Sequence, residues 1–295
     1  MSAPHIAAFM DRMNEVGLAW DDWQFSEPLD NGKLYRYDVA GDKAKSRNGW
    51  YVLYGGRYPA GCFGSWKANI RFSWASTHSR RLSPDALEAI RKEREQSQRK
   101  IETSLYAARE IACKECRSIW QSASNVDSEH PYLLTKNVGA YGIRQYKSSL
   151  LIPVRDTEGR LTSLQFINPD GTKYFKSGGR IKGCFHRIGK PKEQTLYVAE
   201  GYATAATIHE VTGHAVAVAF NAGNLSDVSI SLRIRYPLYE LLIAADNDRF
   251  TAGNPGLTQA RQAAVLSGAG LIVPNFADSE QGSDFNDWVL LERNQ

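Results

Sequence analysis

The sequence predicts an α/β protein whose C-terminal part forms a central, mostly parallel sheet with flanking helices. Apolar runs of strand length occur at 196–199, 241–245 and 271–273. Alanine-rich helical runs follow the first two of them, one from Tyr202 onwards and one at 258–267. Buried strands that alternate with helices are typical of parallel sheets, because each parallel connection needs a crossover segment, usually a helix.

A small α+β module is expected at residues 1–80. Apolar side chains recur at helical spacing from residue 5 to Gly17, and glycine is typical of the end of a helix. Alternating apolar and polar residues then predict short strands. With their turns, the expected strands lie at 33–39, 49–56, 60–66 and 70–74.

A long helical connector is expected at 81–127. Ser83 and Pro84 resemble a helix start, with a capping hydroxyl followed by proline at the first helical position. The apolar stripe behind them is thin, which predicts a solvated helix face or an arm that bridges two domains. Cys113 and Cys116 lie in this helix without a second cysteine pair, so we expect no zinc.

Residues 128–194 are expected to form a basic, strand-rich subdomain that begins with a hairpin at 150–161. From Lys136 to Glu193 the sequence has twelve Lys or Arg and four Asp or Glu. The balance reverses from Glu200 to Arg293, where eleven Asp or Glu stand against five Arg. A basic wall beside an acidic one predicts a cleft that binds phosphates on one side and cations on the other.

Carboxylates follow two of the predicted parallel strands. Glu200, with Gly201, comes after the first strand, and Asp246-Asn247-Asp248 comes after the second. The carboxyl ends of parallel strands meet at the edge where α/β proteins bind ligands, so these acids are expected to converge. They would repel one another without a cation between them. Hard oxygen ligands suit Mg²⁺ or Mn²⁺, which we expect as the cofactor.

These acids carry a resemblance to a known family. Glu-Gly after one strand, Asp-x-Asp after another and the later Gly-Ser-Asp-Phe-Asn-Asp-Trp with Asp284 resemble the Toprim domain of topoisomerases and bacterial-type primases. Segments 219–225 and 244–248 are more narrowly similar to the primases of conjugative plasmids and satellite phages. The resemblance spans 130–292 and implies a Toprim metal-binding domain at 195–295. It implies that Asp284 is a metal ligand, although an acid that favours a helix N-terminus is the alternative.

The resemblance implies a DNA primase that joins nucleoside triphosphates into short RNA primers on single-stranded DNA. Asp246 and Asp248 would hold metal with help from Asp284, and Glu200 would be a metal ligand or the base that prepares the primer 3′-hydroxyl. The implied partners are single-stranded DNA, nucleoside triphosphates and a replicative helicase encoded elsewhere. A Toprim nuclease and a non-catalytic single-stranded DNA-binding replication protein are the alternatives.

Basic and aromatic side chains in two segments are expected to contact nucleic acid or nucleotide. The sequence has no Asp or Glu from Lys43 to Pro84, where Lys and Arg are interleaved with aromatic residues, as a surface for single-stranded nucleic acid requires. The alternative for the aromatic residues is the core of a small sheet. The candidates are Arg57, Trp66, Lys67, Arg71 and Trp74 in this segment, and Lys173, Lys176, Arg180 and Lys182 near the metal.

Composition and cysteine content predict a cytoplasmic protein. Hydrophobic content of 42% and charged content of 23% are ordinary for a globular protein. No apolar run approaches the roughly 20 residues of a membrane span, and the N-terminus lacks the features of a signal peptide. Four cysteines in 295 residues do not make a disulfide framework. We therefore expect a reduced compartment and no membrane contact.

Overall fold

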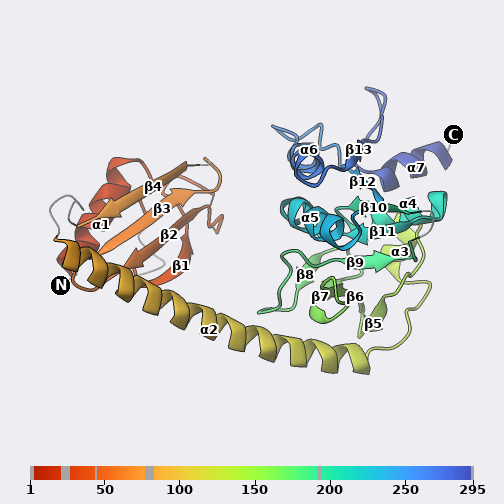
Figure 1. Ribbon diagram of the computed structural model, residues 1–295. Helices are drawn as coiled ribbons and strands as arrows, with labels where there is room; N and C mark the ends of the chain where they lie inside the picture. Colours follow the sequence, from red (N-terminus) through yellow and green to blue (C-terminus); the bar gives the residue numbers. More distant parts are fainter. Residues whose placement is uncertain are drawn as a thin grey trace. The chain divides into compact units, whose positions relative to one another are not determined.

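The computed structural model describes residues 3–20, 27–43, 45–68, 70–76, 83–191 and 194–293, and the chain divides into two compact units (Figure 1). The units are Met1–Tyr106 and Ala107–Gln295. The predicted boundary between residues 80 and 81 lies outside the described residues. Among the helices that the described residues form, none combines the length and the apolarity that crossing a membrane requires.

The first unit contains a helix packed on a four-stranded antiparallel sheet, as the sequence predicts. Helix α1 (Pro4–Glu15) places Phe9 at the centre of the core, edge-on to Tyr51, Phe63 and Trp74. The sheet order is β1-β2-β3-β4, so neighbours in sequence are neighbours in space. The strands are β1 (Asn31–Tyr37), β2 (Gly49–Tyr54), β3 (Ala60–Ser65) and β4 (Ile70–Ala75).

Helix α2 (Pro84–Ser122) begins in the first unit and ends in the second. Its first half is held by ion pairs between neighbouring turns, such as Arg91 with Glu88 and Glu95, rather than by a broad apolar face. Near its C-terminal end Cys116 is buried against the second unit, and the Cys113 thiol lies 3.7 Å from the carbonyl oxygen of Thr162. The predicted long helix is therefore confirmed.

The second unit begins with a short helix and an antiparallel sheet. Helix α3 (Pro131–Lys136) starts with proline at its first turn and ends at Asn137, which has a left-handed backbone. The sheet order is β5-β6-β7-β8. Its strands are β5 (Arg144–Tyr146), β6 (Ser149–Arg155), β7 (Leu161–Ile167) and β8 (Lys173–Phe175).

A five-stranded sheet in the order β13-β12-β10-β11-β9 completes the second unit. All of its strands run parallel except β9, which pairs antiparallel with β11. The strands are β9 (His186–Ile188), β10 (Thr195–Ala199), β11 (Ala215–Val218), β12 (Glu240–Ala244) and β13 (Gly270–Ile272). The helices are α4 (Tyr202–Thr212), α5 (Leu225–Arg235), α6 (Pro255–Ser267) and α7 (Phe285–Arg293), with a 3₁₀ turn at Ala222–Asn224. The predicted mostly parallel sheet with flanking helices is confirmed.

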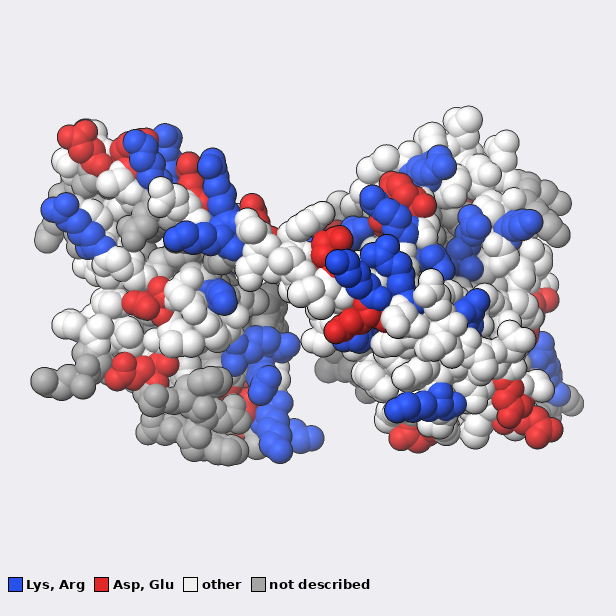
Figure 2. Space-filling view, turned by 90° about the horizontal axis from the view of Figure 1, so that it is seen from below, with Lys and Arg blue, Asp and Glu red and all other residues white. Residues whose placement is uncertain are grey.

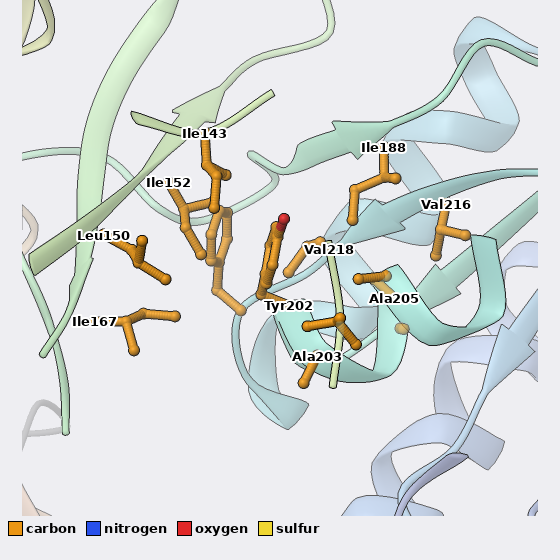
Figure 3. Close-up of a cluster of buried hydrophobic side chains, with 14 of the residues drawn as sticks. Ile143, Leu150, Ile152, Ile167, Ile188, Tyr202, Ala203, Ala205, Val216 and Val218 are labelled. Atoms are coloured by element: carbon orange, nitrogen blue, oxygen red, sulfur yellow. The ribbon is translucent and has the colours of Figure 1, made fainter. Parts of the chain in front are cut away.

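The two sheets of the second unit share one core. The β6–β7 hairpin packs against Cys116 of α2 on one face, and on the other face it meets α4 and the five-stranded sheet around Tyr202 (Figure 3). The buried Tyr202 hydroxyl donates to the carbonyl oxygen of Gly139 (2.9 Å) and accepts from the backbone N–H of Tyr141 (2.7 Å). The shared core includes Leu150, Ile152 and Ile167 from the hairpin, and Ile188, Val216 and Val218 from the five-stranded sheet.

Candidate active site

The ends of β10 and β12 bring the predicted acids to one edge of the sheet. These two strands are parallel neighbours, and Ala199 pairs with Ala244 in their register. Glu200 directly follows Ala199, and Asp246 comes two residues after Ala244. The chain then turns away at Gly201, which precedes α4 with an extended backbone. The parallel pairing thus places the two carboxylates beside each other, as the sequence predicts.

Asp246 lies at the centre of the acidic cluster. Burial, followed by the charges of Glu200, Asp284 and Asp248, raises the pKa of Asp246 from 3.8 to about 8, and the nearby Lys173 ammonium opposes this shift. One of its oxygens, Oδ1, is buried and has no hydrogen-bond partner in the described part of the chain. A buried carboxylate oxygen without a donor is costly, and a cation would satisfy it.

Glu200 shares this environment. Burial and then the charge of Asp248 raise the pKa of Glu200. A hydrogen bond from the backbone of Ala222 and the charge of Lys173 act in the opposite direction. The charges of Asp248 and Asp284 act on the pKa of both Glu200 and Asp246, so both carboxylates lie within electrostatic range of this pair.

Asp248 is fixed to the start of α6. Its Oδ2 atom accepts a hydrogen bond from the backbone N–H of Gly256 at 2.8 Å. A methyl group on Gly256 would lie 2.8 Å from that same Oδ2 atom and 2.8 Å from the carbonyl oxygen of Asp246. Only glycine therefore lets the helix approach the Asp-Asn-Asp turn this closely.

Asp284 lies at a helix N-terminus and also acts electrostatically on the other acids. It immediately precedes α7, and its Oδ1 atom accepts from the backbone N–H of Asp287 at 2.9 Å. An acid in this place stabilises a helix N-terminus. The same carboxylate also raises the pKa of Asp246 and Glu200, so it belongs to the acidic cluster as well.

Asn247 organises the loops around the cluster, a role that the sequence does not reveal. Its backbone N–H donates to the carbonyl oxygen of Ser283 at 2.6 Å, and its side-chain oxygen accepts from the Asn254 amide at 2.8 Å. The turn after β12 is thereby tied to the loops that precede α6 and α7. The sequence signal that could have pointed to Asn247 is its position between Asp246 and Asp248.

Arg249 secures the same region from the other side. Its guanidinium group donates to the carbonyl oxygens of Phe276, Ala277 and Glu280 and lies against the rings of Phe250 and Phe276. The side chain thus fastens the loop after β13 to the turn that carries the aspartates. The contacts of Asn247 and Arg249 thus both hold the turn that carries the aspartates.

Lys173 is the predicted basic residue that lies near the acids. It begins the exposed strand β8, and its ammonium group is 5.7 Å from the ring centroid of Tyr132. Loss of water and then the charge of Lys136 lower the pKa of Lys173, while Asp284, Asp246 and Glu200 act in the opposite direction. Lys136 was missed by sequence reasoning; its Nζ atom lies 3.4 Å from Asp287.

The other three predicted phosphate contacts lie in separate ion pairs. Figure 2 shows Lys and Arg gathered on the viewed face of the second unit. Arg180 and Lys182 line an open polar cleft of about 400 Å³ that Asp156, Glu158 and Asp227 also line. The ion pairs are Lys176 with Glu115 (2.5 Å), Arg180 with Asp156 (3.3 Å) and Lys182 with Asp227 (3.6 Å). The structure does not bring these three side chains into the acidic cluster.

Asn224 links this basic region to the five-stranded sheet. The buried side-chain amide donates to the carbonyl oxygens of Ile181, Cys184 and Ala219, and its oxygen accepts from the backbone N–H of Gly183. The sequence marks this residue only as a part of segment 219–225. Its four hydrogen bonds identify it as a positioning residue between the two sheets.

The candidates in the first unit lie on different sides of its sheet. Trp66 is 59% exposed, and Arg71 is exposed on β4. Trp74 instead packs edge-on against Phe9, with ring centroids 5.5 Å apart. The remaining two candidates are Lys67, which pairs with Asp42 at 2.5 Å, and Arg57, which lines a hollow of about 510 Å³ together with Trp74.

The acidic cluster suits a divalent cation that takes some of its ligands from elsewhere. The donors are all carboxylates, the ligand type that Mg²⁺ and Mn²⁺ prefer, and the Oδ1 atom of Asp246 lacks a partner among the described residues. Within the same described ranges, no three His, Cys, Asp or Glu side chains stand ready to hold a metal by themselves. Such a cation would need further oxygens from water or from substrate phosphates, which is usual for Mg²⁺.

Comparison with known proteins shows what the chain resembles. Residues 195–294 match the family model described as a Toprim domain, a kind of domain that generally binds divalent metal. Two proteins of Escherichia coli called DNA primase TraC are each 31% identical to the chain, over 271 and 291 residues. These alignments cover 86% and 92% of this chain but 25% and 20% of the relatives, so the chain spans about a quarter of their length or less.

A solved structure, the primase fragment of the bacteriophage T7 primase-helicase protein, is 15% identical and has a TM-score of 0.41. It covers 59% of this chain and 76% of its own, and a likeness of this size bears on neither the site nor the reaction. The resemblance first noted in the Glu-Gly and Asp-x-Asp motifs is confirmed by the sequence matches. Residues 195–294 therefore match the Toprim domain, and most of the chain is similar in sequence to a part of the TraC DNA primases.

Proposed function

We propose that this chain is a DNA primase that joins nucleoside triphosphates into short RNA primers on a single-stranded DNA template. The observation that carries the proposal is the group of four carboxylates, three at the ends of β10 and β12 and Asp284 before α7, with Lys173 beside them. Acids for a metal next to a cation for phosphates are what nucleotidyl transfer requires. The relationship to proteins named DNA primase supports the choice of reaction.

Asp246, Asp248 and Asp284 would hold the metal, which we propose to be Mg²⁺ or Mn²⁺. When bound, the metal would neutralise charge on the triphosphate and on the leaving pyrophosphate. The protein keeps these side chains in place through the Asn247 contacts and the hydrogen bond from Gly256 to Asp248. These contacts hold the backbone of the Asp-Asn-Asp turn in place, so that side-chain rotation would be enough to bring the carboxylates to a metal.

Glu200 has two candidate roles, as a metal ligand or as the base for the primer 3′-hydroxyl. Its raised pKa favours a proton acceptor that works closer to neutral pH than an ordinary glutamate. Lys173 lies close enough to lower the pKa of Glu200 and Asp246. We assign to Lys173 the binding of the triphosphate, with Lys136 next to it as a second cation.

The test uses single-stranded template, labelled nucleoside triphosphates, and Mg²⁺ or Mn²⁺. The expected product is a set of short labelled oligomers from the wild type and none from Asp246→Asn. Asp278→Asn is the matched control, since Asp278 is an exposed acid of the same domain. Shortening of the template instead of synthesis would indicate a Toprim nuclease, and retention of the strand without any chemistry would indicate a non-catalytic binding protein.

A further inference from the structure

The sheet of the first unit has one face that α1 does not cover. The register pairs Arg36 with Trp50, Trp50 with Gly64, and Gly64 with Arg71. Paired residues of adjacent strands point to the same side of a sheet, so these four residues form one row across all four strands. The next row contains the buried Tyr51 and points to α1, which places the row with the arginines on the opposite, outer face.

Two indole rings lie on this outer face. Trp50 covers Gly64 so closely that a methyl group there would come within 2.9 Å of the Trp50 ring. The ring of Trp66 lies next to it, with centroids 5.5 Å apart and planes inclined by 34°. Trp66 is 59% exposed, so together the two indoles present an aromatic surface to solvent rather than a single stray side chain.

The surroundings of the indole pair are positively charged. From the first residue of β1 to the last of β4 the sequence has eight Lys or Arg and two Asp. Asp38 is buried and accepts from two backbone N–H groups, and Asp42 is engaged by Lys67. Arg36 and Arg71 are exposed at the two ends of the row, and a hydrogen bond from Nε to the carbonyl oxygen of Arg47 holds Arg36 in place.

We infer that the outer face of this sheet binds single-stranded nucleic acid. Unpaired bases stack on Trp66 and Trp50, and Arg36 and Arg71 contact the phosphates on either side. An exposed indole can stack only on a base that is not enclosed in a duplex, and the basic flanks select a polyanion over an apolar protein partner. The inference rests on the proposed function, because the template of a primase is the strand that this face would hold.

The test measures binding of the whole 295-residue chain to short single strands of dT and rU in EDTA by fluorescence anisotropy. Trp66→Ala is expected to lower the affinity about tenfold, as loss of one stacked base does, without changing the slope of log affinity against log salt. Arg71→Gln is expected to flatten that slope by about 0.7, the value for one phosphate contact on a single strand. The matched controls are Tyr106→Ala, at another exposed aromatic side chain, and Arg12→Gln, on α1; both should bind like the wild type.

Several results would overturn the inference. The wild type could bind neither strand, or Trp66→Ala could bind as tightly as the wild type. Tyr106→Ala could lose as much affinity as Trp66→Ala, or a duplex could compete as well as a single strand. Finally, the protein could bind phosphatidylserine vesicles through Trp66 but not bind nucleic acid. EDTA removes the divalent metal that primer synthesis would need, so the binding assay tests the surface independently of the proposed primase activity. A wild type that binds through Trp66 yet makes no primers refutes the primase alone. If the wild type makes primers and Trp66→Ala binds single strands normally, the binding surface is refuted but the primase is not.

Discussion

Replacing Asp246 by Asn is expected to stabilise the metal-free protein while abolishing primer synthesis. Both effects come from one carboxylate. A bound metal needs its negative charge, but without metal the burial and the three other acids oppose that charge and keep the proton on the carboxyl group. An amide has nearly the same shape and no charge to bury, so the variant avoids the penalty and loses the ligand.

The size of the stabilisation follows from the pKa of Asp246. The unfolded chain releases this proton near pH 3.8, whereas the folded chain retains it up to about pH 8. The unfolded state therefore binds fewer protons between these values, so the stability of the metal-free protein falls as pH rises through this window and stays level above it. From the pKa of the unfolded chain to pH 7 is about three pH units, and each unit costs the wild type about 1.4 kcal/mol. The stabilisation of Asp246→Asn at pH 7 is therefore at most about 4 kcal/mol.

The assay is calorimetric unfolding in EDTA at about pH 5 and about pH 8, on either side of most of this titration. The melting temperature of the second unit should be higher in Asp246→Asn than in the wild type, with the larger difference at the higher pH, by roughly 2–4 °C for each kcal/mol in a unit of this size. Added Mg²⁺ should raise the melting temperature of the wild type more than that of the variant. The control Asp278→Asn should follow the wild type throughout. Equal melting temperatures of wild type and Asp246→Asn at the higher pH in EDTA would refute the reasoning, as would wild-type primer yield from the variant.

Three further predictions concern Lys173, Asn224 and Gly256. Lys173→Ala is expected to lower primer yield about a hundredfold, because Lys173 lies near the acids. Lys176→Ala should lower it far less, because Lys176 already forms an ion pair with Glu115 of α2. Equal primer yields from the two variants would show that proximity to the acids is irrelevant. Asn224→Ala should reduce the free energy of unfolding by about 2–4 kcal/mol in urea denaturation, since it leaves several buried backbone groups without a partner. Gly256→Ala should weaken stabilisation by Mg²⁺, because the new methyl group would lie 2.8 Å from Asp248 Oδ2, and an unchanged Mg²⁺-induced shift in melting temperature would contradict this.

The acids could be placed from sequence because strand ends are a local signal with a fixed spatial meaning. Once 196–199 and 241–245 are identified as parallel strands, Glu200 and Asp246 must emerge at the same edge. Lys173 could be proposed from charge and position. Asn247 could not be given a role, because its partners Ser283 and Asn254 belong to loops whose paths depend on the tertiary fold.

The basic and aromatic candidates could not be sorted from sequence for a similar reason. Arg180 pairs with Asp156, 24 residues earlier, and no local pattern announces such a partner. Trp66 and Trp74 look alike in the sequence, but Trp66 comes directly after β3 while Trp74 lies within β4 and faces α1. The turn between the two strands breaks the alternation, so counting residues does not reveal which side each ring takes.

The antiparallel strand β9 has a consequence for how the chain folds during synthesis. It lies in the predicted basic subdomain, yet its partner β11 is formed by residues 215–218, which leave the ribosome later. Until then β9 has an open edge, and Leu150 and Ile152 lack the layer that covers them. A product that ends near residue 194 would therefore expose an apolar face beside an unpaired strand, the combination that favours aggregation. The nascent basic subdomain must consequently wait for the first half of the Toprim sheet before it can reach its native state.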